Sequence, residues 1–152
     1  MAYKNEAAFS KALAAALKER GASVTRIETG MTSQGVPDMF VQMNGGDVWL
    51  ELKNMPTLTA ELAEKKGKVK IAWRPGQVGW AYQYWLRHGR KKCSLTVIAG
   101  KSEFFIVLMR ALWVSSEVFA SSLVKAESLE SVAAAVQLAV DGRLCSMRKE
   151  EA

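Results

Sequence analysis

Two carboxylates and a lysine lie at a spacing that suits a metal-ion site. Asp38 follows Pro37 at the start of one strand-like run, and Glu51 and Lys53 stand one residue apart in the next run. Mg²⁺ takes one or two carboxylates from a protein and keeps most of its waters and a substrate phosphate as its other ligands. A bound Mg²⁺ polarises a phosphate and lowers the pKa of a water, while a nearby lysine orients that water or neutralises developing charge. These residue types therefore point to phosphodiester hydrolysis.

The elements that must position these side chains form a predicted β-hairpin. Residues 37–43 and 48–53 are strand-like runs joined by the turn sequence Asn-Gly-Gly-Asp. Pairing across the two glycines places Asp38 opposite Lys53, with Glu51 diagonal to Asp38 at ~7–8 Å. The alternative is a solvent-exposed ion pair between Asp38 and Lys53, with Glu51 merely solvated. The other face of the hairpin is apolar and is expected in the core, through Met39, Val41, Met43, Val48, Leu50 and Leu52.

The remaining pattern alternates helices and strands in a chain of 152 residues, which is enough for one domain. Hydrophobic periodicity and turn residues predict the other elements. They are a helix at 4–20, a strand at 24–28, an irregular basic loop at 54–72 with a short helix at 59–65, a helix at 75–88, a hairpin at 94–99 and 103–109, and a helix at 128–140.

Composition excludes several classes of protein. No run approaches the ~18 apolar residues of a membrane span, and the charged N-terminus is unlike a secretory signal, so a cytoplasmic protein is expected, in the host bacterium if the gene is a phage's. Two cysteines and one histidine leave no disulfide scaffold and no Cys/His zinc site.

Positive charge is concentrated in the middle of the chain. The net charge is +6, yet residues 65–110 hold eleven lysines and arginines against Glu103 alone. Such an asymmetry is typical of a surface that binds nucleic acid, although an ordinary solvated face is the alternative. The residues expected to contact DNA are Lys65, Lys66, Lys68, Lys70, Arg74, Arg87, Arg90, Lys91 and Lys92.

Together these motifs resemble a known nuclease family. Gly-Val-Pro-Asp at 35–38, followed by Glu51-Leu52-Lys53, is similar to the PD-(D/E)xK motif. The order of an N-terminal helix, these two strands, a basic loop and a helix opened by Arg-Pro-Gly-Gln at 74–77 resembles the VRR-NUC (virus-type replication-repair nuclease) branch, in its small stand-alone phage form. The resemblance covers about residues 5–109.

This resemblance implies a fold and a set of roles. The fold would be α/β, a restriction-endonuclease-like core in which a mixed sheet is flanked by helices. Asp38 and Glu51 would bind the metal with the backbone carbonyl of Leu52, and Lys53 would be the catalytic lysine. Gln77 would support the lysine and the bound phosphate, unless it only caps the turn before its helix.

A glutamate of the first helix joins the metal site in such families. Glu6 lies seven residues before Leu13 and shares the apolar face of Phe9, whereas Glu19 points elsewhere. Glu6 is therefore the expected ligand. The alternative is that Glu6 reaches past the helix end into water or favours the N-terminal helix dipole.

The predicted function is a Mg²⁺-dependent endodeoxyribonuclease, with Mn²⁺ able to substitute, that cuts branched DNA such as Holliday junctions and leaves 5′-phosphate and 3′-hydroxyl ends. Alternatives are a less selective phage DNA endonuclease acting on single strands, flaps or host DNA, and a non-catalytic nucleic-acid-binding module. No small-molecule cofactor and no membrane are expected as partners.

Residues 110–145 form a C-terminal extension that matches no motif and is expected to be helical. Its apolar residues must be buried, either in a homodimer interface, which would suit two-fold symmetric DNA, or in a helical layer on the chain's own sheet. They are Leu112, Trp113, Val114, Val118, Phe119 and Leu123.

Overall fold

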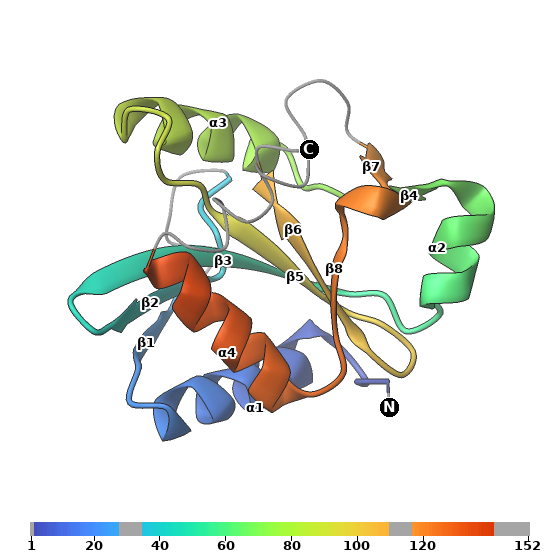
Figure 1. Ribbon diagram of the computed structural model, residues 1–152, viewed down its shortest axis with the longest axis horizontal. Coiled ribbons are helices and arrows are strands. Elements are labelled where there is room, and N and C mark those ends of the chain that lie inside the picture. Colours follow the sequence, from blue (N-terminus) through green and yellow to red (C-terminus); the bar gives the residue numbers. More distant parts are fainter. Residues whose placement is uncertain (1, 28–34, 110–116, 142–152) are drawn as a thin grey trace.

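A six-stranded mixed sheet forms the centre of the molecule (Figure 1), for which the computed structural model describes residues 2–27, 35–109 and 117–141. The strand order is β1-β2-β3-β5-β6-β8, and every neighbouring pair is antiparallel except β3 and β5, which are parallel. The strands are β1 (Ser23–Arg26), β2 (Met39–Met43), β3 (Gly46–Asn54), β5 (Leu95–Ala99), β6 (Phe104–Leu108) and β8 (Val124–Ala126).

Helices cover both faces of this sheet. On one face α1 (Glu6–Glu19) and α4 (Leu129–Val140) lie side by side, as Figure 1 shows. The connection from β3 to β5 covers the other face, because parallel strands need a long crossover. This crossover holds α2 (Ala60–Lys66), β4 (Lys68–Lys70) and α3 (Gln77–Arg87), and β4 pairs with β7 (Glu117–Phe119) in a second, two-stranded sheet.

Two hydrophobic cores follow from the alternation of side chains along the strands. In β3, Leu50 and Leu52 point toward α1 and α4, into a core that also holds Phe9, Leu13 and Val136. In the central strands the opposite face is also apolar and packs beneath the crossover, through Ile98, Phe105, Val107, Ala81 and Val118. Glu51 and Lys53 lie on this second face because they alternate with Leu50 and Leu52.

The hairpin of β2 and β3 has a different register from the one expected. Met43 pairs with Gly46 and Phe40 with Trp49, so Asp38 does not lie opposite Lys53. The turn consists of Asn44 and Gly45, both with positive φ, as in the type I′ turns that match strand twist. The shift is two residues, so each side chain keeps its predicted face and all six expected core residues are buried.

The C-terminal extension is not wholly helical. In its described part, β7 joins the small sheet and β8 pairs with β6 at the edge of the central sheet, before α4 begins. Val132 and Val136 of α4 are fully buried against the chain's own sheet. Leu112, Trp113 and Val114 lie outside the described residues. No helix within the described ranges has the length and hydropathy that a membrane crossing requires.

Candidate active site

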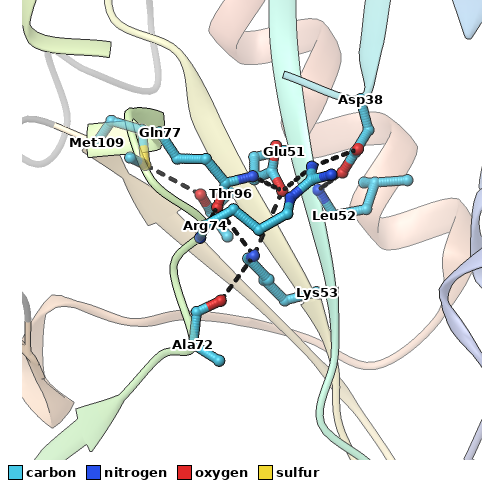
Figure 2. Close-up of polar contacts among 9 residues, drawn as sticks. All are labelled: Asp38, Glu51, Leu52, Lys53, Ala72, Arg74, Gln77, Thr96 and Met109. Carbon is cyan, nitrogen blue, oxygen red and sulfur yellow. Dashed lines mark hydrogen bonds and ion pairs between the residues drawn. The ribbon is translucent and has the colours of Figure 1, made fainter. Parts of the chain in front are cut away.

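The predicted catalytic residues meet where β2 begins, β3 nears its end and α3 begins (Figure 2). Glu51, Lys53 and Gln77 are all buried, with relative exposures of 4%, 6% and 4%. Because polar groups so deeply buried are costly unless they are hydrogen-bonded, their partners define the site. The predicted quartet Asp38, Glu51, Lys53 and Gln77 is therefore brought together in space.

Gln77 holds the acidic and basic halves of the site in one network. Its Oε1 accepts hydrogen bonds from Lys53 Nζ at 3.0 Å and from the Arg74 backbone N–H at 2.8 Å. Its Nε2 donates to Glu51 Oε2 at 2.6 Å. Both expected roles are present, because Gln77 closes the turn before α3 and also fixes the lysine beside the carboxylate.

Lys53 is held by groups from both sides of the site. Its Nζ donates to the Ala72 carbonyl at 2.9 Å and lies 3.5 Å from Glu51 Oε2. The ammonium is also 5.5 Å from the centre of the Trp73 ring, a distance suitable for a cation–π contact. These contacts fix an otherwise flexible side chain in one position.

The two carboxylates lie close enough to share a cation. Asp38 Oδ2 accepts a hydrogen bond from the Leu52 backbone N–H at 2.9 Å, which ties the start of β2 to the end of β3. Arg74 Nη2 lies 3.2 Å from Asp38 Oδ1 and 3.5 Å from Glu51 Oε2. The guanidinium therefore bridges the carboxylates where the sequence predicts a metal ion.

Glu51 is the group most perturbed by its surroundings. Burial, reinforced by the neighbouring Asp38 carboxylate, raises the pKa of Glu51 from 4.5 to about 7, although Lys53 and Arg74 act in the opposite direction. Its Oε1 is buried with no hydrogen-bond partner, whereas Oε2 contacts Gln77, Lys53 and Arg74. An unpartnered buried carboxylate oxygen suits a ligand that supplies positive charge.

This donor set fits Mg²⁺, which needs only one or two carboxylates. Glu6 and Asp38 line one cavity of about 620 Å³ together with Leu52, so the first helix does face the site. Glu6 is exposed at the first position of α1, and among the described residues no three metal-ligating side chains are close enough to share an ion. The metal-binding role of Glu6 thus stays a prediction.

A close backbone contact positions the segment before β2 against α3. Gly35 has φ +90°, and a Cβ built on it would lie 2.2 Å from the Gly76 carbonyl oxygen. Only glycine fits this approach, because a side chain would need both a left-handed backbone and the space of another peptide group. The glycine of the Gly-Val-Pro-Asp motif therefore helps to place Asp38 near Gln77.

The predicted DNA-binding residues fall into two clusters and one exception. The first cluster is exposed at the end of α2 and on β4, and the second follows α3, at the other end of the molecule in Figure 1. Arg74 is the exception because it lies in the site itself, and Lys92 forms an ion pair with Asp47. The clusters are Lys65, Lys66, Lys68 and Lys70, and Arg87, Arg90, Lys91 and Lys92.

Three features of the site do not follow from the sequence. The Ala72 carbonyl carries no sequence signal, since any residue supplies a backbone oxygen. Trp73 stands out in the sequence only as an aromatic within a basic stretch. Arg74 is predicted to bind DNA, and its position directly before Pro75-Gly76-Gln77 is the one clue that it shares the site with Gln77.

Comparisons with known proteins support the fold. No family model and no curated protein sequence matches this chain. Among solved structures, it is similar to Hjc, a Holliday junction resolvase from the archaeal hyperthermophile Archaeoglobus fulgidus. The TM-score is 0.56 at 14% sequence identity, over 82% of this chain and 97% of Hjc. Identity this low carries the fold alone, and it confirms the α/β, restriction-endonuclease-like fold, a mixed sheet flanked by helices, that the sequence predicts.

Proposed function

We propose that this protein is a Mg²⁺-dependent endodeoxyribonuclease that cuts branched DNA. The observation that carries this proposal is the buried network in which Gln77 joins Lys53 to Glu51, beside Asp38. Support also comes from a fold shared with a Holliday junction resolvase. The order of the motifs further favours the stand-alone phage form of the VRR-NUC family, and Mn²⁺ is expected to replace Mg²⁺.

The chemistry is hydrolysis of a phosphodiester bond. A water oxygen attacks phosphorus, the bond from phosphorus to the 3′ oxygen breaks, and that oxygen takes up a proton, which leaves 5′-phosphate and 3′-hydroxyl ends. Bound Mg²⁺ would polarise the phosphate and lower the pKa of the attacking water. Asp38, Glu51 and the Leu52 carbonyl would hold the ion, and Lys53 would orient the water or neutralise the charge that develops.

A non-catalytic module is less consistent with the site. Glu51 and Lys53 are almost wholly buried, and burying charged groups is costly unless they pair and hydrogen-bond. A domain that only binds DNA needs positive charge on its surface rather than a carboxylate pair inside. The deeply buried charges are explained by catalysis and not by binding alone.

The decisive experiment measures Mg²⁺-dependent cleavage of four-way junctions, flaps, single strands and duplexes. Asp38→Ala, Glu51→Gln and Lys53→Ala should each abolish cleavage while DNA affinity in EDTA stays within a few-fold. Glu6→Gln should reduce cleavage at limiting Mg²⁺, and Glu19→Gln should not. Near-normal turnover by any of the first three variants would contradict the assigned site, and equal cutting of all four substrates would favour the less selective nuclease.

We also propose that the active form is a homodimer, because two-fold symmetric DNA suits a two-fold symmetric enzyme. Sedimentation at micromolar concentration, with and without a four-way junction, tests this. A monomer in both conditions that still cuts both symmetric strands would exclude the dimer without affecting the nuclease proposal.

A further inference from the structure

A second cavity lies beside the catalytic lysine, away from the carboxylates. It has a volume of about 410 Å³ and is bounded by the segment after β3, by α2 and by β4. Met55, two residues after Lys53, lines its wall with Leu58 and Leu62. This volume falls within the ~300–1,000 Å³ of small-molecule sites, and an apolar wall suits a flat ring system.

The rim of this cavity is basic. Lys66, Lys68 and Lys70 all line it and are exposed, and the one acidic lining residue is Glu117, which stands opposite Lys70 in the β4–β7 pair. Apolar walls beneath several ammonium groups are the combination that a nucleotide needs, with its base in the cavity and its phosphates at the rim.

An exposed aromatic ring extends this surface. Phe119 is 54% exposed, and the Lys68 ammonium lies 5.0 Å from the centre of its ring. Phe119 pairs with Lys68 across the small sheet, whose next pair, Val69 and Val118, is buried. The ring is therefore presented on a supported strand, beside a positive charge, as in proteins that stack unpaired bases.

The cavity is joined to the catalytic residues through the backbone. Two residues after β4, the Ala72 carbonyl accepts the hydrogen bond from Lys53 Nζ. A strand bound along β4 would thus reach the site within a few residues.

We propose that this cavity binds one unpaired nucleotide of the DNA substrate, with its base against Leu62 and Met55, its phosphates on the rim lysines and an adjacent base stacked on Phe119. The proposal rests on the proposed nuclease function and adds to it a source of selectivity, because a base inside a duplex is stacked and cannot enter the cavity. A second copy of this chain is a poorer occupant, since a two-fold contact here would bring each lysine cluster against itself.

The first test compares binding to two DNAs of equal length, one fully paired and one with a single unpaired nucleotide, in EDTA so that neither is cut. Wild type should prefer the unpaired form by at least about fivefold, the lower end of what stacking one base contributes. Leu62→Trp should fill the cavity and remove the preference, while duplex affinity changes little. Ala15→Trp, which adds the same ring to an exposed position on α1, should retain the preference.

The second test needs no variant to fold. Photocrosslinking of wild type to DNA carrying 5-iododeoxyuridine at the unpaired position should label peptides containing Met55 or Phe119. Crosslinks confined to α3 or the residues after it, or an unchanged preference in a folded Leu62→Trp variant, would overturn the nucleotide site. In either case Mg²⁺-dependent cleavage by wild type would show that the nuclease proposal stands, whereas wild type that neither binds nor cuts DNA would defeat both.

Discussion

At the scale of single residues, the site places Glu51 under two opposing influences. The carboxylate must be ionised to bind a cation, yet burial and Asp38 favour its protonated form. Arg74, 46% exposed at the mouth of the site, offsets part of this cost because its guanidinium bridges both acids. The charge state of Glu51 therefore couples stability, pH and metal binding.

We expect the metal-free protein to become less stable as pH rises through this range. The folded protein keeps the Glu51 proton up to about pH 7, while the unfolded chain releases it near 4.5. Folding thus takes up a proton between these values, so the free energy of unfolding should fall as pH rises from about 4.5 to 7 and level off above.

Thermal unfolding in EDTA across this range tests the expectation, with Glu51→Gln as the variant that cannot titrate and should show a flatter profile. Added Mg²⁺ should raise the unfolding temperature most at the alkaline end, where Glu51 is ionised. Identical pH profiles for wild type and Glu51→Gln would contradict the raised pKa.

Replacing Arg74 should strengthen metal binding. Arg74→Met removes the guanidinium that competes for Asp38 and Glu51, so calorimetry should show Mg²⁺ or Mn²⁺ binding a few-fold more tightly, since each half-exposed ion pair contributes ~0.2–1 kcal/mol. The control is Arg20→Met, whose guanidinium binds Gln137 on the far side of the sheet and should not affect the metal. Weaker metal binding in Arg74→Met would mean that Arg74 supports the ion rather than replacing it.

At the scale of elements, the site depends on how closely the segment before β2 approaches α3. Gly35→Ala would set a methyl group against the Gly76 peptide and should cost ~1–3 kcal/mol of stability, or separate Asp38 from Gln77 and lower cleavage. Gly21→Ala is a matched control, because Gly21 has a similar φ of +89° with nothing within 4 Å. Cleavage and unfolding midpoints of both variants should therefore differ, and equal losses would show that backbone strain alone is responsible.

The elements themselves are largely predictable from the sequence, whereas their exact alignment is not. Hydrophobic periodicity identifies α1, α3, α4 and both hairpins, since each buries one regular stripe. The turn at residues 44–47 offers two pairings, and only the structure distinguishes Asn44-Gly45 from the two glycines as its centre. Strands β4, β7 and β8 escape prediction because three-residue strands held by distant partners have no detectable period.

The same distinction applies to the site. Asp38, Glu51, Lys53 and Gln77 follow from their motif, because their spacing is fixed by two adjacent strands and a helix start. The bridging position of Arg74 and the carbonyl of Ala72 depend on how the crossover returns to the sheet, which no local pattern encodes.

At the scale of the whole molecule, the two basic clusters lie on either side of the site and mark a path for DNA (Figure 1). If the cluster on α2 and β4 binds phosphates, its neutralisation should weaken binding to every DNA and reduce the salt slope by ~0.9 for each phosphate that the protein no longer neutralises. The variant replaces four lysines by glutamine, Lys65, Lys66, Lys68 and Lys70. Its control replaces exposed lysines in and just before α1, Lys4, Lys11 and Lys18. Equal slopes for wild type and the first variant would identify a solvated surface.

The position of β8 at the edge of the central sheet has a consequence for synthesis of the protein. Every predicted catalytic residue has left the ribosome by residue 77, but β6 gains its outer neighbour only when Val124–Ala126 emerge, and α4 covers the core face later still. A nascent chain that already carries the entire motif therefore exposes an apolar strand edge, which is a template for wrong pairing. Chaperones would meet this chain in its sticky form, and nuclease activity would begin only after its last helix has docked.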